Sequence, residues 1–150
     1  MPPGQKDAGG AVGISINEHE LAAAVFLVLV PGAMLPDGQP HSCLVWVDHD
    51  GTCARVNTTL QRRSGRNLLA DPRVSLLLVD RTDTARFLQV RGRAELVSQG
   101  ALEHLDELTR RYTRHRCYYG HVYPGEQAAR EDRVIVRIHA RRVTLDAIHV

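Results

Sequence analysis

The segment Arg86–Val97 constrains the fold more than any other, because small or apolar residues alternate with polar ones along its length. The first set is Leu88, Val90, Gly92, Ala94 and Leu96, and the second is Gln89, Arg91, Arg93 and Glu95. Successive side chains of a β-strand point to opposite faces of its sheet. The segment is therefore predicted to be a strand with one face in a core and the other in water.

Several other segments have the apolar or β-branched composition of strands. We expect them over residues 25–30, 41–48, 52–56 and 74–79, with a last strand from 134–138 and 143–145. Turn signals at Pro36–Pro40 and Asp50-Gly51 predict a meander of the first three. About six strands joined mainly by hairpins favour an antiparallel sheet that closes, or nearly closes, into a barrel, because closure removes unpaired edges. The expected fold is mainly β with flanking helices.

Three helices are expected beside these strands. Asn17 is suited to cap a short helix that runs to residue 24, and a basic helix after Thr59 should end before Asp71-Pro72, because proline disfavours helical geometry in the preceding residue. Ser98 is expected to begin the third. Its apolar face at helical spacing is predicted to pack on the sheet and contains Leu102, Leu105, Leu108 and Tyr112.

The junction between the strand at 52–56 and the basic helix has the composition of an anion site. It holds two hydroxyls and three arginines, namely Thr58, Thr59, Arg62, Arg63 and Arg66. The threonines are expected to cap the helix, and free N–H groups at a helix N-terminus favour an anion. The alternative is an ordinary solvated helix face, but the fixed position between two predicted strands favours the anion site.

Length and charge limit the domain organisation. A chain of 150 residues with 43% hydrophobic residues suits one domain, which we assign to residues 17–150 after a flexible, Gly/Pro-rich leader at 1–16. The formal net charge is +2, whereas a surface that coats nucleic acid needs a strong basic excess. No nucleic-acid partner is therefore expected.

Cysteine usage and hydropathy favour a soluble cytoplasmic protein. Cys43, Cys53 and Cys117 are odd in number and widely spaced, which argues against a disulfide framework. The apolar run 21–35 is broken by Pro31-Gly32 and is shorter than the ~20 residues that span a bilayer. No metal site is expected, since the fragments Cys117-x-x-x-His121 and His41-x-Cys43 do not complete a four-ligand pattern.

The order of the motifs resembles a known family. LPDGQPHSCLVWVDHDG, VNTTLQRRSGRNLLADPRVSLLLVD, FLQVRGRAELV and a leucine-spaced helix ending in RRY occur in the order of the pyridoxamine 5'-phosphate oxidase-like flavoproteins. Within them the chain looks most like the probable deazaflavin (coenzyme F420) dependent enzymes, over residues 18–145. The resemblance implies a six-stranded antiparallel split β-barrel and a homodimer with two cofactor sites at its interface.

The resemblance also assigns residues to the cofactor. The cofactor phosphate would be held by Asn57, Thr58, Thr59, Arg62 and Arg63, and the ring would lie near Leu44, Val45 and Trp46. Relatives often read RRK before RNL, so Ser64 replaces a frequent phosphate-binding lysine. Residues 31–34, PGAM, also depart from the regular strand and Ala-Thr-Leu segment of relatives.

The implied activity is that of a flavin/deazaflavin-dependent oxidoreductase, which transfers a hydride from reduced F420 to a small conjugated or quinone-like substrate. Because the cofactor supplies the chemistry, this scheme requires no catalytic side chain and we assign none. Two alternatives remain. FMN satisfies the same phosphate contacts, and Ser64 favours a non-catalytic protein that only binds the cofactor.

Overall fold

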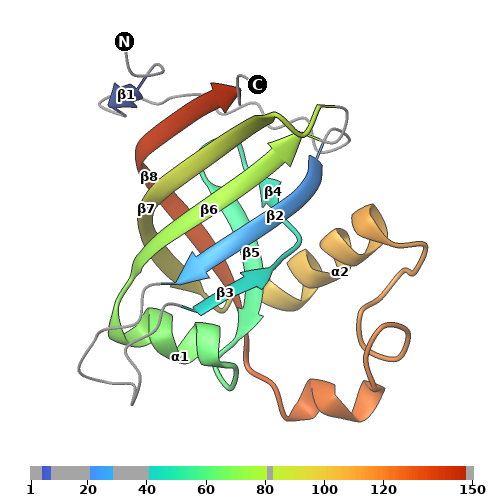
Figure 1. Ribbon diagram of the computed structural model, residues 1–150. Coiled ribbons are helices and arrows are strands. Elements are labelled where there is room, and N and C mark those ends of the chain that lie inside the picture. The colour runs from blue at the N-terminus through green and yellow to red at the C-terminus, as the bar shows by residue number, and fades with distance from the viewer. Residues whose placement is uncertain (1–4, 8–20, 29–40, 81–82, 148–150) are drawn as a thin grey trace.

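The computed structural model describes residues 5–7, 21–28, 41–80 and 83–147, and all structural statements refer to these ranges. Its strands are β1 (Gln5–Asp7), β2 (Leu21–Val28), β3 (His41–Leu44), β4 (Asp48–His49), β5 (Ala54–Thr59), β6 (Arg73–Asp80), β7 (Arg86–Val97) and β8 (Arg133–Ala147). Two α-helices, α1 (Arg63–Ala70) and α2 (Ala101–Tyr112), and a 3₁₀ helix at Gly125–Ala129 complete the elements. Figure 1 shows the sheet curling into an open barrel, with α1 at one end and α2 at its side.

The sheet is antiparallel throughout, in the order β3-β2-β6-β7-β8-β5-β4, and β1 pairs with β8 off this path. The predicted mainly-β antiparallel split barrel is therefore confirmed. Its longest pairing joins β7 to β8, from Arg86 opposite Ala147 to Val97 opposite Ile135. Of the expected leader, residues 5–7 form β1, and residues 1–4 and 8–16 lie outside the described part of the chain.

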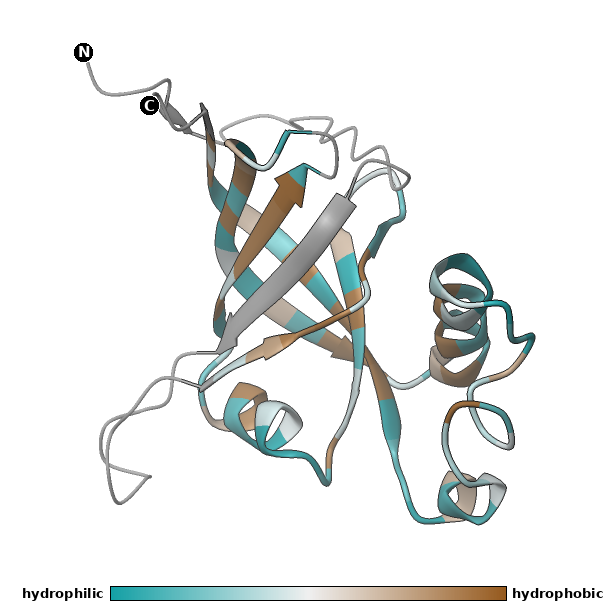
Figure 2. Ribbon diagram, turned by 45° about the vertical axis from the view of Figure 1, so that its right-hand side comes forward, coloured by the Kyte–Doolittle hydropathy of each residue, from teal (hydrophilic) through white to brown (hydrophobic). Residues whose placement is uncertain are grey.

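The core lies inside the curled sheet. Hydrophobic and hydrophilic residues alternate along the strands (Figure 2), as the pattern in β7 predicted. Val90 in β7 is fully buried against Leu76 of β6 and Val136 of β8, which lie in the same hydrophobic cluster. Apolar side chains of neighbouring strands thus share one closed face, and their burial is the main force that holds the sheet curled.

The predicted helix at 17–24 is wrong where the structure describes it, because residues 21–24 belong to β2. This strand pairs with β6 on one side and β3 on the other, and those pairings override the helix propensity of the three consecutive alanines. Residues 17–20 and 29–30 lie outside the described ranges. Within the described ranges, no helix is long and apolar enough to cross a membrane.

The predicted strand at 41–48 is interrupted at residues 45–47. The Tyr112 hydroxyl of α2 donates to the Val47 carbonyl oxygen at 2.7 Å and accepts from the Val47 N–H at 3.3 Å. The Tyr112 hydroxyl thus bonds both backbone groups of Val47, which a neighbouring strand would bond in a regular sheet. The two hairpins of the predicted meander are both present, since β3 pairs with β2 and β4 pairs with β5. Its continuous middle strand is not, so β3 and β4 lie at opposite ends of the strand order and β3 does not pair with β5.

The helix ends differ from the predicted caps. Strand β5 runs through Thr58 and Thr59, so neither threonine is the N-cap of α1, which is Arg62 without a side-chain cap bond. Thr59 still holds the turn, because its Oγ1 accepts the Arg62 N–H at 3.1 Å. The end of α1 before Asp71-Pro72 is confirmed.

Helix α2 begins later than predicted and turns a different face inward. Its N-cap is Gly100 rather than Ser98, with a positive φ of 74° that glycine adopts readily. Leu102 is 46% exposed, whereas the polar residues His104 and Thr109 are buried beside Leu105 and Leu108.

Gly65 allows α1 to lie directly against the end of β5. A Cβ on this residue would stand 2.1 Å from the carbonyl oxygen of Thr59 and 3.0 Å from the Cα of Leu60. Both neighbours are backbone atoms, which cannot rotate out of the way. The distance between α1 and β5 is therefore set by contact between main chains.

Replacing Gly65 with alanine should lower the free energy of unfolding by about 1 to 3 kcal/mol, because an inserted methyl group forces main-chain shifts. The sign of this change distinguishes the contact from a propensity effect. In an unobstructed helix, replacing glycine with alanine raises the free energy of unfolding by up to about 1 kcal/mol. Urea unfolding measures the change, and Leu69→Ala, at a residue 65% exposed on the same helix, is the control. A more stable Gly65→Ala variant would contradict the contact.

Replacing Tyr112 with phenylalanine should lower the free energy of unfolding by about 1 to 3 kcal/mol, because the buried N–H and C=O of Val47 lose their partner. Amide hydrogen exchange at Val47 should become faster in the same variant. Tyr123→Phe, at a residue 39% exposed, serves as the control. Unchanged exchange at Val47 would show that another group holds residues 45–47.

Candidate functional site

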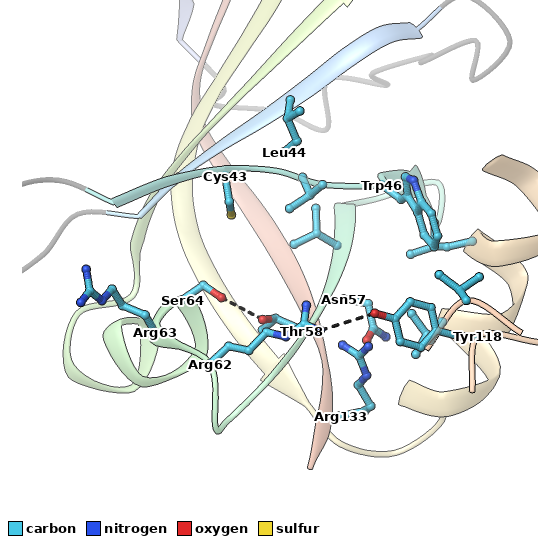
Figure 3. A pocket seen from close by; sticks show the side chains of 15 residues that line it. Cys43, Leu44, Trp46, Asn57, Thr58, Arg62, Arg63, Ser64, Tyr118 and Arg133 are labelled. Atoms are coloured by element: carbon cyan, nitrogen blue, oxygen red, sulfur yellow. Dashed lines mark hydrogen bonds between the residues drawn. The ribbon is translucent and has the colours of Figure 1, made fainter. Parts of the chain in front are cut away.

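A cavity of about 550 Å³ lies where the barrel is split. Strand β5 pairs with β8 along its whole length, but its other edge pairs with β4 only at Ala54 and Arg55. The cavity occupies the open edge beyond Arg55, between β5 and the segment that leads from β3 to β4 (Figure 3). Helix α2, the start of α1 and the segment from Tyr118 to Arg133 complete its wall.

Eight of the nine residues predicted to bind a cofactor line this one cavity. They are Leu44, Val45, Trp46, Asn57, Thr58, Arg62, Arg63 and Ser64. Thr59 does not line it, because its side chain is fully buried and its Oγ1 accepts a hydrogen bond from the Arg62 backbone. Their role in cofactor binding stays a prediction, but the fold brings these residues together around one cavity.

One end of the cavity carries hydroxyls and guanidinium groups. Thr58 Oγ1 and Ser64 Oγ lie 2.8 Å apart, and both side chains are buried. Arg62 and Arg63 stand at the same end in Figure 3. Arg66, which was predicted to share this role, donates instead to the Gln61 carbonyl oxygen and does not line the cavity. This end therefore has donors for an anion from two arginines and a hydroxyl pair.

Arg62 is held in place by groups from across the cavity. Its Nη2 donates to the Tyr118 hydroxyl at 3.4 Å and lies 4.0 Å from Glu131. Burial lowers the pKa of Arg62, but the hydrogen bond to Tyr118 and the nearby Glu131 carboxylate outweigh it, so the pKa is raised overall. The guanidinium thus stays charged in a half-buried position.

Aromatic and apolar side chains form the other end. Trp46 stacks on Tyr112 with ring centroids 5.8 Å apart and an angle of 6° between planes, and Tyr118 meets Trp46 edge-on at 6.3 Å. Leu105 and Leu108 of α2 add an aliphatic wall. An apolar pocket that faces a few convergent polar groups is typical of small-molecule and cofactor sites.

Seven residues of the lining were not assigned to the cofactor from the sequence: Cys43, Val56, Leu105, Leu108, Tyr118, Val122 and Arg133. The α2 leucines were expected only to pack on the sheet. Tyr118 and Val122 lie in the turn-rich segment after α2, where no strand or helix pattern indicates which side chains point inward. The sequence indicates only that Arg133 lies at the start of the last predicted strand, which does not show that its side chain faces a cavity.

A buried polar network connects α2 to the strand beside the cavity. Asp48 accepts two hydrogen bonds from Arg55, at 2.8 and 2.6 Å, and lies 3.1 Å from His104 Nε2. The other ring nitrogen of His104 is 3.2 Å from Asn57 Nδ2, which also donates to the Ala101 carbonyl oxygen at 2.8 Å. Burial raises the pKa of Asp48, but the bonds from His104 and Arg55 outweigh it and lower the pKa overall.

A second cysteine–histidine contact lies outside the cavity. Cys53 Sγ is 3.6 Å from His139 Nδ1, and His139 Nε2 is 2.6 Å from Glu95 Oε2, an order that resembles a nucleophile, a base and its orienting acid. The thiol is nevertheless inaccessible, because Cys53 is 2% exposed and burial raises its pKa. A buried thiol of raised pKa is a packing group rather than a nucleophile.

The lining does not have the composition of a metal or acid–base site. No group of three His, Cys, Asp or Glu residues close enough to hold a metal occurs in the described ranges. None of the described residues that line the cavity is acidic, and three of them are arginines. The site as described favours the binding of an anionic, partly aromatic molecule.

Comparisons with known proteins agree with this geometry. The sequence profile of the family described as pyridoxamine 5'-phosphate oxidase matches residues 26–145. A solved structure titled F420 reductase is 26% identical, with a TM-score of 0.64 over 83% of this chain and 90% of that one. A conserved hypothetical protein from Mycobacterium tuberculosis is 30% identical, with a TM-score of 0.59 over 83% and 76%.

A FAD-binding protein from Mesorhizobium loti shares the fold at 17% identity, with a TM-score of 0.56 over 82% of this chain and 83% of that one. A search of curated proteins found no match. The profile match extends over most of the chain, from within β2 to residue 145 in β8, and includes every residue that lines the cavity. The chain therefore belongs to the pyridoxamine 5'-phosphate oxidase-like family of flavin-binding oxidoreductases.

Proposed function

We propose that the protein is an F420-dependent reductase that acts on a small conjugated or quinone-like substrate. The observation that carries the proposal is one cavity that has arginines and hydroxyls at one end and an aromatic, apolar wall at the other. A phosphate-bearing ring cofactor has the same two-part chemistry. The similarity to the structure titled F420 reductase supports the deazaflavin over other flavins.

The residues present fit the phosphate of such a cofactor. In the Thr58–Ser64 pair one hydroxyl proton forms the mutual bond, and the other proton remains able to donate to an anion. Arg62 and Arg63 supply the cationic contacts that a lysine at position 64 supplies in relatives. Guanidinium groups bind phosphate through two parallel hydrogen bonds, which compensates for the smaller side chain of Ser64.

The residues at the other end fit the ring. Leu44, Val45 and Trp46 offer an apolar surface, and Leu105 and Leu108 exclude water from the opposite side. When bound and reduced, the deazaflavin would supply the hydride, and the protein would supply orientation and a dry environment. No side chain of the cavity is needed as a nucleophile or base for this role.

The proposed enzyme is a homodimer with its cofactor sites at the interface. Two apolar side chains of the cavity lining are exposed, since Leu44 is 76% and Val122 is 41% exposed. Exposed apolar groups that gather beside a binding site mark an interaction surface. A second copy of the chain would cover them and narrow the cavity.

Sedimentation velocity tests the dimer directly. The wild-type chain should sediment as a dimer, and Leu44→Glu should shift it toward monomer, because a charge at the interface core disfavours association. Leu69→Glu, at an exposed leucine that does not line the cavity, should leave the dimer intact. A monomeric wild-type chain at micromolar concentration would exclude the dimer.

Cofactor titration tests the activity and the site together. F420 should raise the unfolding temperature and be bound more tightly than FMN, and Arg62→Ala with Arg63→Ala should weaken F420 by on the order of 100-fold or more. Each charge-assisted contact contributes about 1.5 to 3 kcal/mol. Arg66→Ala is the matched control, because this exposed arginine lies on the same helix outside the cavity.

The rivals give different results in the same titration. If the purified protein shows a flavin absorption band and does not bind added F420, FMN is the cofactor. Tight F420 binding without reduction of any quinone or enone would support a cofactor-binding protein, which the absence of a lysine at position 64 favours. Unchanged F420 affinity in the double arginine variant would place the phosphate elsewhere.

A further inference from the structure

A carboxylate stands beside the anion end of the cavity without lining it. Glu131 Oε1 lies 4.0 Å from Arg62 Nη2, and Glu131 Oε2 lies 3.9 Å from Arg133 Nε. Both arginines line the cavity (Figure 3), whereas Glu131 does not. Within the described ranges, no other carboxylate forms an ion pair with either arginine. The charge of Glu131 therefore acts on the same space that the phosphate of a bound cofactor would occupy.

Glu131 is fixed in this position by bonds on both sides. The Tyr119 hydroxyl donates a hydrogen bond to Oε2, and the Glu131 side chain is 12% exposed. The next residue, Asp132, donates its N–H to Gln61 Oε1 at 2.8 Å and accepts from Gln61 Nε2 at 2.7 Å. Gln61 directly precedes Arg62. The carboxylate is thus held against movement away from an arriving anion.

The charges around this end of the cavity nearly balance. Arg62 and Arg133 are cations and Glu131 is an anion, which leaves one net positive charge among the three. Arg63 is exposed, so water and salt screen its contribution. Coulomb attraction grows in proportion to the charge of a ligand, whereas the cost of removing an ion from water grows with the square of its charge. One net positive charge therefore suits a singly charged anion better than a doubly charged one.

We propose that Glu131 is a specificity-determining residue, which makes the anion end of the cavity select a singly charged phosphodiester over a doubly charged phosphomonoester. The inference rests on the proposed function, because it takes the phosphate site at Arg62 as given. Glu131 acts through its charge and not through contact, since it does not line the cavity. A neutral side chain at this position would leave the two arginines unopposed and would favour the dianion.

This selection distinguishes the two candidate cofactors. The phosphate of FMN is a monoester, which carries close to two negative charges at neutral pH. The phosphate of F420 is a diester and carries one. Repulsion from the Glu131 carboxylate is therefore about twice as large for the phosphate of FMN as for that of F420.

Titration with two small phosphate esters tests the selection without any flavin, with the NMR shifts of the Ser64 and Gly65 amides as the measure of binding. At about pH 8, above the second ionisation of a monoester near pH 6, methyl phosphate is a dianion and dimethyl phosphate a monoanion. The wild-type chain should bind dimethyl phosphate at least as tightly as methyl phosphate. Glu131→Gln should bind dimethyl phosphate about two- to fivefold more tightly and methyl phosphate about four- to 25-fold more tightly.

Two matched variants control for the charge and its position. Asp132→Asn removes the same charge at the next residue, which is exposed, and should change either affinity by less than about twofold because solvent screens it. Glu131→Asp keeps the charge and should keep the wild-type preference. If the gain in Glu131→Gln is equal for the two esters, or no larger than in Asp132→Asn, the proposal is overturned.

The outcomes also separate this proposal from the proposed function. If neither ester shifts the Ser64 or Gly65 amide in any chain, the anion site is absent and both proposals fail. If the esters bind as expected but F420 and FMN do not, the proposed function fails and the role of Glu131 stands.

Thermal unfolding distinguishes selection from a purely structural role. A structural role predicts that Glu131→Gln loses stability and ester affinity together, whereas selection predicts a higher affinity even where the loss of the ion pairs lowers the stability. If Glu131→Gln does not fold, the wild-type chain decides the question. Tighter binding of methyl phosphate than of dimethyl phosphate by the wild type overturns the proposal.

Discussion

The paired hydrogen bonds between the Tyr112 hydroxyl and the backbone of Val47 determine where the barrel stays open. A strand that continued from β3 through residues 45–47 would be free to pair with β5 and close the sheet. Because a side chain of α2 satisfies Val47 instead, the edge of β5 beyond Arg55 remains unpaired and the cavity forms there. The same tyrosine stacks on Trp46, so one residue both opens the barrel and supports the aromatic wall.

Charge is distributed unevenly between the cavity and its supports. Outside the cavity lining, the carboxylate of Asp48 bonds Arg55 of β5 and His104 of α2. These bonds hold α2 against β5. Inside the cavity the described lining has arginines without acids. Buried charges are stable when they are paired. The framework carboxylate Asp48 is paired in this way, whereas in the cavity Arg62 and Arg133 share the single carboxylate of Glu131, at 4.0 and 3.9 Å.

The sequence predicts the elements that depend on local rules and misses those that depend on distant contacts. Strand β7 follows from its alternation, and the end of α1 follows from Asp71-Pro72, because both patterns act within a few residues. The helix predicted at 17–24 was wrong for residues 21–24, since pairing with β6 decides their conformation. About half of the candidate site was predicted, because those residues fall in two short segments, 44–46 and 57–64, which the family resemblance assigns to a cofactor. Tyr118 and Arg133 were not assigned to the site, because only the folded chain brings them to β5.

The contact between Gly65 and the main chain of Thr59 has a consequence for how the site can vary among related sequences. Where side chains set a spacing, a change in core volume shifts the elements that they separate. Here the spacing is set by backbone on backbone, so α1 keeps its distance from β5 when core residues change size. The position of the turn that carries Arg62 therefore does not depend on the size of the core side chains. Ligand preference in such a scaffold can change through single cavity residues, while the frame that presents them stays constant.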